Sequence, residues 1–177
     1  MRIIFLLLMG ITAVFAADKP AEDVLKNTIV AQKTITSEEF SRKAVQGGML
    51  EIEAGKIALS KSRDGNVKAF AQRMITDHGG ANAELQNIVG TRYSLPTQLD
   101  AENQAKFEAL SIKSGADFDN AYGKAMMQDH QDAIGLFTEA STASTVSPAL
   151  QQFARKTLPT LQEHHRLSMT LPSAPSK

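Results

Sequence analysis

The strongest constraint on the fold is the helical spacing of apolar residues within several long segments. In the segment 66–89 this spacing leaves one gap, between Met74 and Ala81, and His78 fills it. The apolar positions there follow steps of three and four: Val67, Ala71, Met74, Ala81, Leu85 and Ile88. Such steps place side chains on one face of an α-helix. The pattern therefore predicts an amphipathic helix with a histidine on its buried face.

Three further segments show the same spacing and predict long helices. The first opens at Thr36, which with Glu39 forms the pattern of a capping box, and it runs to about residue 62. Gly47, Gly48 and Gly55 weaken this helix intrinsically, and close approach of a neighbouring helix would compensate for them. The other long helices span about residues 117–143 and 148–171, and a short helix spans about residues 100–113.

The order of these segments predicts the fold class. No segment alternates apolar and polar residues as a half-buried strand does, so we expect an all-α protein. Short turns near residues 64 and 145 join the long helices into two hairpins, and one longer connection joins the hairpins. This order predicts a ferritin-like four-helix bundle over residues 37–171, with a short extra helix in the crossover between the two hairpins. An up-and-down bundle with short loops is the alternative.

The first sixteen residues are typical of a secretory signal peptide. Arg2 precedes an apolar run that ends at Ala16, and an uncleaved membrane anchor is the alternative. The run is shorter than the roughly 20 residues of a spanning helix. We therefore expect cleavage after about Ala16 and a periplasmic protein without a transmembrane segment. The remaining expected regions are an N-terminal arm at 17–36, the bundle at 37–171 and a disordered tail at 172–177.

Composition narrows the possible partners and ligands. Without residues 1–16 and their single basic residue, the chain keeps 18 basic and 19 acidic side chains. This balance argues against a nucleic-acid partner, which requires a basic face. The chain has no cysteine, so an exported form is held by packing rather than disulfides. Any metal site must use nitrogen, oxygen or thioether ligands, and nothing in the sequence identifies a protein partner.

Two of the four histidines occupy the same local pattern, Met-x-x-Asp-His-x-x-Ala. It occurs at residues 74–81 and again 52 residues later at 126–133, once in each predicted hairpin. His78 and His130 therefore both lie on apolar faces of their helices. His164 lies on the apolar face of the last helix in the same way, whereas the neighbouring His165 faces solvent.

The position of each residue along its hairpin predicts which side chains meet. Glu51 is 13 residues before the turn at Asp64 and His78 is 14 residues after it, so the two are level. His130 and His164 are about 15 and 18 residues from the other turn, a mismatch of about 4.5 Å that loop geometry absorbs. Glu51 also lies nearer the packing face of its helix than Glu53 does.

One carboxylate and three imidazoles at a similar height suggest a shared cation. Buried polar groups without partners cost about 1–3 kcal/mol each, and one ion would satisfy all four. Glu51, His78, His130 and His164 are the candidate ligands, and zinc, copper, iron and nickel all accept this donor set. The acids beside the histidines are expected to support them as outer partners: Asp77, Asp129 and Glu163.

Other interpretations compete with this one. The histidines and Glu51 could form a hydrogen-bonded structural network in a protein of envelope stress or protein interaction. Met74 and Met126, each one turn before a histidine, could bind Cu(I), although methionine at such positions more often fills core space. The Glu-x-x-His pairs of di-iron oxidases are missing, which disfavours that chemistry. An oxidoreductase with an unfamiliar ligand set stays open as a further alternative.

Three segments resemble a bacterial exported family known as domain of unknown function 4142. They are the Gly-Gly-Met-x-Glu-x-Glu segment at 47–53, the Asp-His pairs, and Leu-Pro-Thr-Leu-x-x-His at 158–164. The resemblance covers about residues 37–171. It implies a helical bundle of the ferritin-like superfamily outside the cytoplasm, and it matches the four candidate ligands to recurrent polar positions. The family carries a provisional outer membrane label, but no strands of a membrane barrel are evident.

These observations together predict a non-enzymatic role. We expect a periplasmic helical bundle that buffers or delivers a transition metal through Glu51, His78, His130 and His164. Because imidazole must lose its proton to bind a metal, affinity should weaken below about pH 6.

Overall fold

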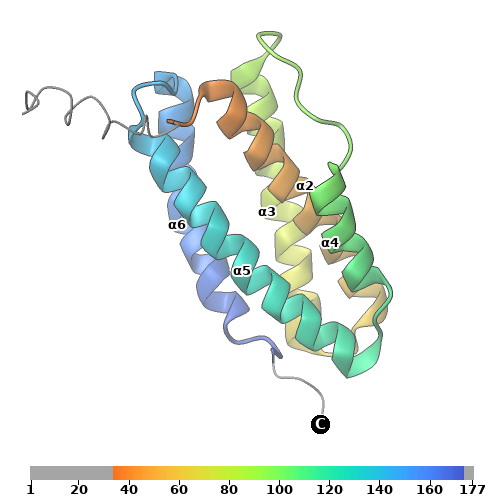
Figure 1. Ribbon diagram of the computed structural model, residues 1–177. Coiled ribbons are helices and arrows are strands. Elements are labelled where there is room, and N and C mark those ends of the chain that lie inside the picture. The colour runs from red at the N-terminus through yellow and green to blue at the C-terminus, as the bar shows by residue number, and fades with distance from the viewer. Residues whose placement is uncertain (1–33, 174–177) are drawn as a thin grey trace, which may run out of the picture. The chain divides into compact units, whose positions relative to one another are not determined.

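The computed structural model describes residues 34–173, and within this range it contains five α-helices and no strand (Figure 1). The all-α expectation is confirmed, and the helix boundaries agree with the predicted ones within about three residues. The helices are α2 (Ser37–Lys61), α3 (Gly65–Val89), α4 (Ala101–Ser111), α5 (Gly115–Thr142) and α6 (Pro148–Ser168).

Some sequence-based expectations fall outside the described range. The predicted signal peptide at 1–16, residues 17–33 of the predicted arm and residues 174–177 of the predicted tail are not described. Among the helices of residues 34–173, none combines the length and the apolar character needed to span a membrane.

The long helices pair as two hairpins that pack against each other. α2 packs mainly along α3, and α5 packs mainly along α6. Contacts of α2 with α5, and of α3 with α6, join the hairpins, while α4 lies in the crossover against α2 and α5 (Figure 1). The first hairpin turns tightly at Asp64, whose carboxylate accepts hydrogen bonds from the amides of Asn66 and Val67 at 2.7 and 3.1 Å. This N-cap explains why α3 begins so soon after α2 ends.

A buried amide side chain of α2, that of Gln46, attaches the crossover to this helix. Gln46 donates from Nε2 to the carbonyl of Gln98 at 2.8 Å and accepts at Oε1 from the amide of Asp100 at 2.9 Å. Asp100 then caps α4 by accepting from the amide of Asn103 at 3.0 Å. Gln46 therefore places α4 beside the middle of α2.

Two of the three glycines in α2 lie where α3 comes close, as the sequence suggested. A Cβ at Gly55 would lie 3.0 Å from the carbonyl oxygen of Ala71, and one at Gly48 would lie 2.6 Å from Oδ1 of Asn82. A Cβ at Gly47 would meet nothing within 4 Å, so that glycine is not explained by helix packing. Gly55 therefore meets the backbone of α3, whereas Gly48 meets only the end of the Asn82 side chain.

The core consists of two apolar clusters separated by a polar layer. The first cluster is rich in phenylalanine and lies where α2 begins and α3 ends, and the second lies at the opposite end of the same helices. Between them each long helix has one buried polar residue, namely Glu51, His78, His130 and His164. Members of the first cluster include Phe40, Leu85, Phe137 and Phe153, and members of the second include Phe70, Met74, Phe118, Tyr122 and Met126.

Candidate metal centre

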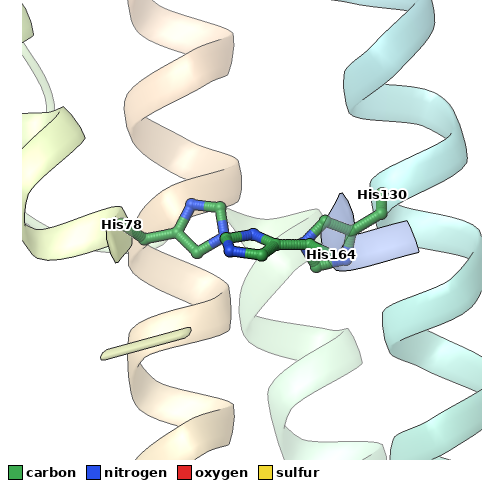
Figure 2. Close-up of side chains that lie close together, drawn as sticks. All are labelled: His78, His130 and His164. Atoms are coloured by element: carbon green, nitrogen blue, oxygen red, sulfur yellow. The ribbon is translucent and has the colours of Figure 1, made fainter. Parts of the chain in front are cut away.

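The polar layer brings the four candidate ligands together at one level of the bundle. Its imidazoles project towards one another from α3, α5 and α6 (Figure 2). Their ring centroids are 5.6 Å apart for His78 and His130, 5.4 Å for His78 and His164, and 5.2 Å for His130 and His164. All three rings are at least nine-tenths buried, as is Glu51 on α2. The predicted convergence of these side chains is therefore present in the structure.

The spacing of the ring nitrogens suits a single ion. One nitrogen from each histidine lies within 4.8 Å of the other two. A tetrahedral ion with nitrogen ligands at about 2.0–2.1 Å would hold those nitrogens roughly 3.4 Å apart. Each pair of nitrogens would therefore have to come closer by at most about 1.4 Å on binding.

The hydrogen bond of His130 prepares its other nitrogen for a ligand. Nδ1 lies 2.8 Å from the carbonyl oxygen of Met126, one turn earlier in α5. A carbonyl oxygen only accepts, so Nδ1 carries the proton and Nε2 carries the lone pair in the neutral ring. Nε2 is buried and has no hydrogen-bond partner among the described residues. Metal-binding histidines are held in this way by an outer partner on the opposite nitrogen.

His164 shows the same arrangement with the opposite tautomer. Its Nε2 lies 2.8 Å from Oδ2 of Asp77 on α3, and the carboxylate accepts the proton of that nitrogen. Nδ1 is buried without a hydrogen-bond partner in the described part of the chain. Burial lowers the pKa of His164 to about 4, against the opposing hydrogen bond of Asp77 and with a contribution from His78. The ring is therefore neutral at pH 7, with a free lone pair.

Glu51 and His78 form a buried ion pair. Oε2 of Glu51 lies against Nε2 of His78, and Oε1 lies 3.6 Å from Nδ1 of His130. Burial alone would raise the pKa of Glu51, but the charges of His78 and His130 lower it to about 2. Burial would likewise lower the pKa of His78, but the Glu51 carboxylate raises it above its usual value. Both shifts favour the charged forms, so the pair consists of a carboxylate and an imidazolium.

The three predicted outer acids have different positions. Asp77 reaches across to His164 on a neighbouring helix rather than to the adjacent His78. Asp129 lies 3.3 Å from Nζ of Lys106 on α4, and burial raises its pKa despite that lysine. Of the three, Asp77 alone makes a hydrogen bond to an imidazole of the layer.

Glu163 does not join the layer. It is bound to Arg166 at 2.7 Å, and its side chain is 43 % exposed. The Arg166 guanidinium holds the pKa of this carboxyl below its usual value. The expectation that Glu163 supports His164 therefore has no counterpart among its contacts.

Two groups near the layer were not singled out by sequence reasoning. The carbonyl of Met126 orients His130, but every helical residue has such a carbonyl and no sequence signal marks this one. The hydroxyl of Tyr122 is buried without a hydrogen-bond partner among the described residues, and burial followed by the charge of Glu51 raises its pKa. Its spacing of two helical turns before His130 could have indicated it. Phe70 separates it from the layer, with its ring centroid 6.3 Å from Tyr122 and 6.1 Å from His130.

Cavities reach the layer from two sides. The larger, of about 550 Å³, is lined by residues of α2 and α5 and by others of α3, α4 and α6, and it reaches the layer at Glu51 and His78. The smaller, of about 350 Å³, lies between α3 and α6 and is lined by Asp77, His78 and His164. A solvated ion therefore has two possible approaches to the buried side chains.

Comparison with known proteins identifies a family and a fold. Residues 24–171 match the sequence model of DUF4142, a domain of unknown function. No curated protein matches the chain. The similar solved structures include two at 15 % sequence identity, and at that identity they show the fold alone. A DUF305 fragment from Deinococcus radiodurans covers 74 % of this chain and 91 % of its own, with a TM-score of 0.65. A DUF305 protein from Streptomyces coelicolor, provisionally named as secreted, covers 75 % and 88 %, with a TM-score of 0.62.

Proposed function

This chain belongs to the DUF4142 family, and we propose that it is a periplasmic protein that binds one transition-metal ion through Glu51, His78, His130 and His164. Its role is to buffer or deliver the metal rather than to turn over a substrate. The proposal includes a ferritin-like bundle, in which metal ligands project inward from facing helices.

One observation carries the proposal: two buried nitrogens have lone pairs and no partner. They are Nε2 of His130 and Nδ1 of His164. In each ring the opposite nitrogen donates a hydrogen bond outward, so the tautomer leaves a ligand-competent nitrogen facing the layer. A buried polar atom without a partner costs about 1–3 kcal/mol, and an ion would remove that cost at both positions.

The charges of the layer favour a divalent ion. Three imidazoles and one carboxylate supply nitrogen and oxygen donors, which suit zinc, copper or iron. An ion between Glu51 and His78 replaces the proton held by that pair, so binding releases it. The pKa of His78 is raised above its usual value of 6.5. As the solution is acidified, affinity should therefore begin to fall while the pH is still above 6.5, rather than only at about pH 6. Below that pKa the loss is about tenfold per pH unit for one displaced proton.

Export to the periplasm is the second element of the proposal. Residues 1–16 have the pattern of a cleaved signal peptide. The similar protein from Streptomyces coelicolor is provisionally named as secreted, which is in keeping with this location. Edman sequencing of the protein purified from the envelope of the host should give a mature chain beginning near Ala17. An uncleaved N-terminus would contradict the expectation.

The direct test is metal content of protein purified without a histidine tag. We expect close to one equivalent of a single transition metal by elemental analysis, or uptake of one equivalent when zinc, copper(II) and iron(II) are titrated separately. His164→Ala should reduce the uptake, whereas His165→Ala is a matched control on the adjacent, half-buried residue and should not. Less than about a tenth of an equivalent, with no uptake on titration, would reject the proposal.

The Glu51–His78 ion pair favours a second candidate, a structural network without metal. In that case His78→Ala leaves Glu51 buried without its partner and lowers stability in a chelating buffer by about 1–3 kcal/mol. A metal ligand instead shows its largest loss when metal is present. Urea unfolding of both proteins with and without one equivalent of metal separates the two roles.

A further inference from the structure

The larger cavity and the smaller cavity differ in how much of the negative charge of their acidic side chains is offset by basic ones. In the smaller one, Asp77 is bonded to His164, and both oxygens of Glu84 lie 2.8 Å from Nζ of Lys156. Lys156 therefore offsets the charge of Glu84, whereas Asp77 is bonded to a neutral ring and keeps its negative charge. The smaller cavity presents this one uncompensated carboxylate to an approaching cation.

The larger cavity retains an excess of negative charge. Among its lining residues six are acidic and three are basic. Asp132 on α5 is exposed, and its hydrogen-bond donor among the described residues is the neutral amide of Gln128. Glu102 on α4 is 81 % exposed in its side chain and lies 3.5 Å from Lys106. A cavity lined by one sign of charge concentrates ions of the opposite sign at its mouth.

Glu51, a proposed metal ligand, lies at the inner end of this cavity. Glu51 lines the larger cavity and not the smaller one, and its carboxylate is 3 % exposed. A cation that enters by the larger cavity therefore meets an anionic oxygen together with the His78 imidazole. The smaller cavity instead leads to two rings, one of which is held by Asp77.

Lys106 stands at the mouth of the larger cavity between two of these acids. Its Nζ lies 3.3 Å from Asp129 and 3.5 Å from Glu102. An ammonium at this position opposes an arriving cation and neutralises the acids that would attract it. Lys106 and Asp132 should therefore affect metal loading in opposite directions.

We infer that the larger cavity is the route by which a hydrated divalent cation reaches the metal centre, with Asp132 and Glu102 attracting it and Lys106 restraining it. This inference rests on the proposed function. It assigns a role in the rate of loading to residues that do not bind the ion in its final position.

The test is stopped-flow loading of Co²⁺ into the metal-free full chain, followed by its visible absorption. At low ionic strength Asp132→Asn combined with Glu102→Gln should slow association by roughly threefold or more, and Lys106→Met should accelerate it. These differences should shrink at 0.5 M salt, where screening extends only about 3–4 Å. The equilibrium Kd should change less than the association rate, because these side chains lie outside the bound ion's ligand set.

Glu84→Gln is the matched control, since it removes one acid from the mouth of the smaller cavity. It should leave the loading rate unchanged. The route is wrong if Glu84→Gln slows loading as much as the double variant does, or if the double variant and Lys106→Met both load at the original rate. If the wild type takes up Co²⁺ and the variants load at the same rate, the route is rejected but the metal centre is not. Failure of the wild type to take up Co²⁺ at all rejects the metal centre and the route together.

Discussion

The phenylalanine-rich cluster and the polar layer lie on the same helix faces but differ in how well burial suits their side chains. In the cluster, Phe40 contacts Phe137 and Phe153 with ring centroids 5.1 and 6.4 Å away. The layer, about three turns further along α2, contains buried nitrogens with no hydrogen-bond partner in the described residues. Burial of the apolar cluster leaves no hydrogen bond unmade, whereas burial of the layer leaves polar atoms without hydrogen-bond partners. Stability and metal binding should therefore be separable by position along one helix.

The largest expected effect is the loss of an aromatic side chain from the cluster. Phe40→Ala should lower the free energy of unfolding by about 3–5 kcal/mol, because Phe40 is wholly buried and its removal leaves a cavity. Metal stoichiometry should stay the same at temperatures where the variant is folded. Urea unfolding followed by circular dichroism gives the first quantity, and elemental analysis gives the second. A folded variant that no longer binds metal would show that cluster and layer are not separable.

The next effect concerns the outer partner of one imidazole. Asp77→Asn should weaken metal binding by about 10–100-fold, because His164 loses the carboxylate that fixes its tautomer. Glu163→Gln is the matched control on the neighbouring position of His164, and its affinity should be unchanged. Competition with a chromophoric chelator measures both. Equal losses in the two variants would mean that Asp77 acts only through its charge.

The contrast between Asp77 and Glu163 shows what sequence could and could not predict about the site. The level of Glu51 with His78, and of His130 with His164, follows from counting residues from each turn, since helical rise is constant. Which acid reaches an imidazole does not follow, because neighbouring residues on a helix point about 100° apart. The partner of His164 comes from another helix, and local competitors decide the rest: Arg166 binds Glu163, and Lys106 binds Asp129.

The fold was more predictable than the site for a related reason. Helix positions follow from local signals, such as apolar spacing and the N-cap at Asp100 that starts α4. The placement of α4 beside α2 involves Gln46, which bonds the crossover 52 residues away, and Lys61, which donates to the carbonyls of Ser111 and Lys113. Nothing in the sequence near Gln46 distinguishes it from an exposed glutamine. Long-range hydrogen bonds of this kind place the wall of the larger cavity.

Acid should weaken the layer before it weakens the cluster. In metal-free protein the pKa of His164 is lowered to about 4. In the unfolded chain this ring is protonated near pH 6.5, whereas in the folded chain it stays neutral down to about pH 4. The free energy of unfolding therefore falls by roughly 2 kcal/mol as pH decreases from 6.5 to 4.5. His78, with a raised pKa, contributes stability that is complete below pH 6.5 and is lost as pH rises through its folded pKa. Glu51, with a pKa of about 2, contributes stability that is lost only below about pH 4.5.

Urea midpoints at intervals between pH 7 and 4.5 measure this dependence. His164→Gln removes the titrating ring and should flatten the curve in that window, while Phe40→Ala should shift the whole curve without changing its slope. A wild-type curve that is already flat would contradict the burial of a neutral His164.

The smallest effect is expected outside both regions, at the ion pair of Lys156 and Glu84. These side chains connect α6 to α3 at the mouth of the smaller cavity, but they are 66 % and 40 % exposed. Exposed pairs are worth about 0–1 kcal/mol because water and salt screen them. Lys156→Gln should therefore shift the urea midpoint only slightly and leave metal affinity unchanged. A larger loss would mean that contact between α3 and α6, which holds His78 and His164 facing each other, depends on this pair rather than on the buried residues beneath it.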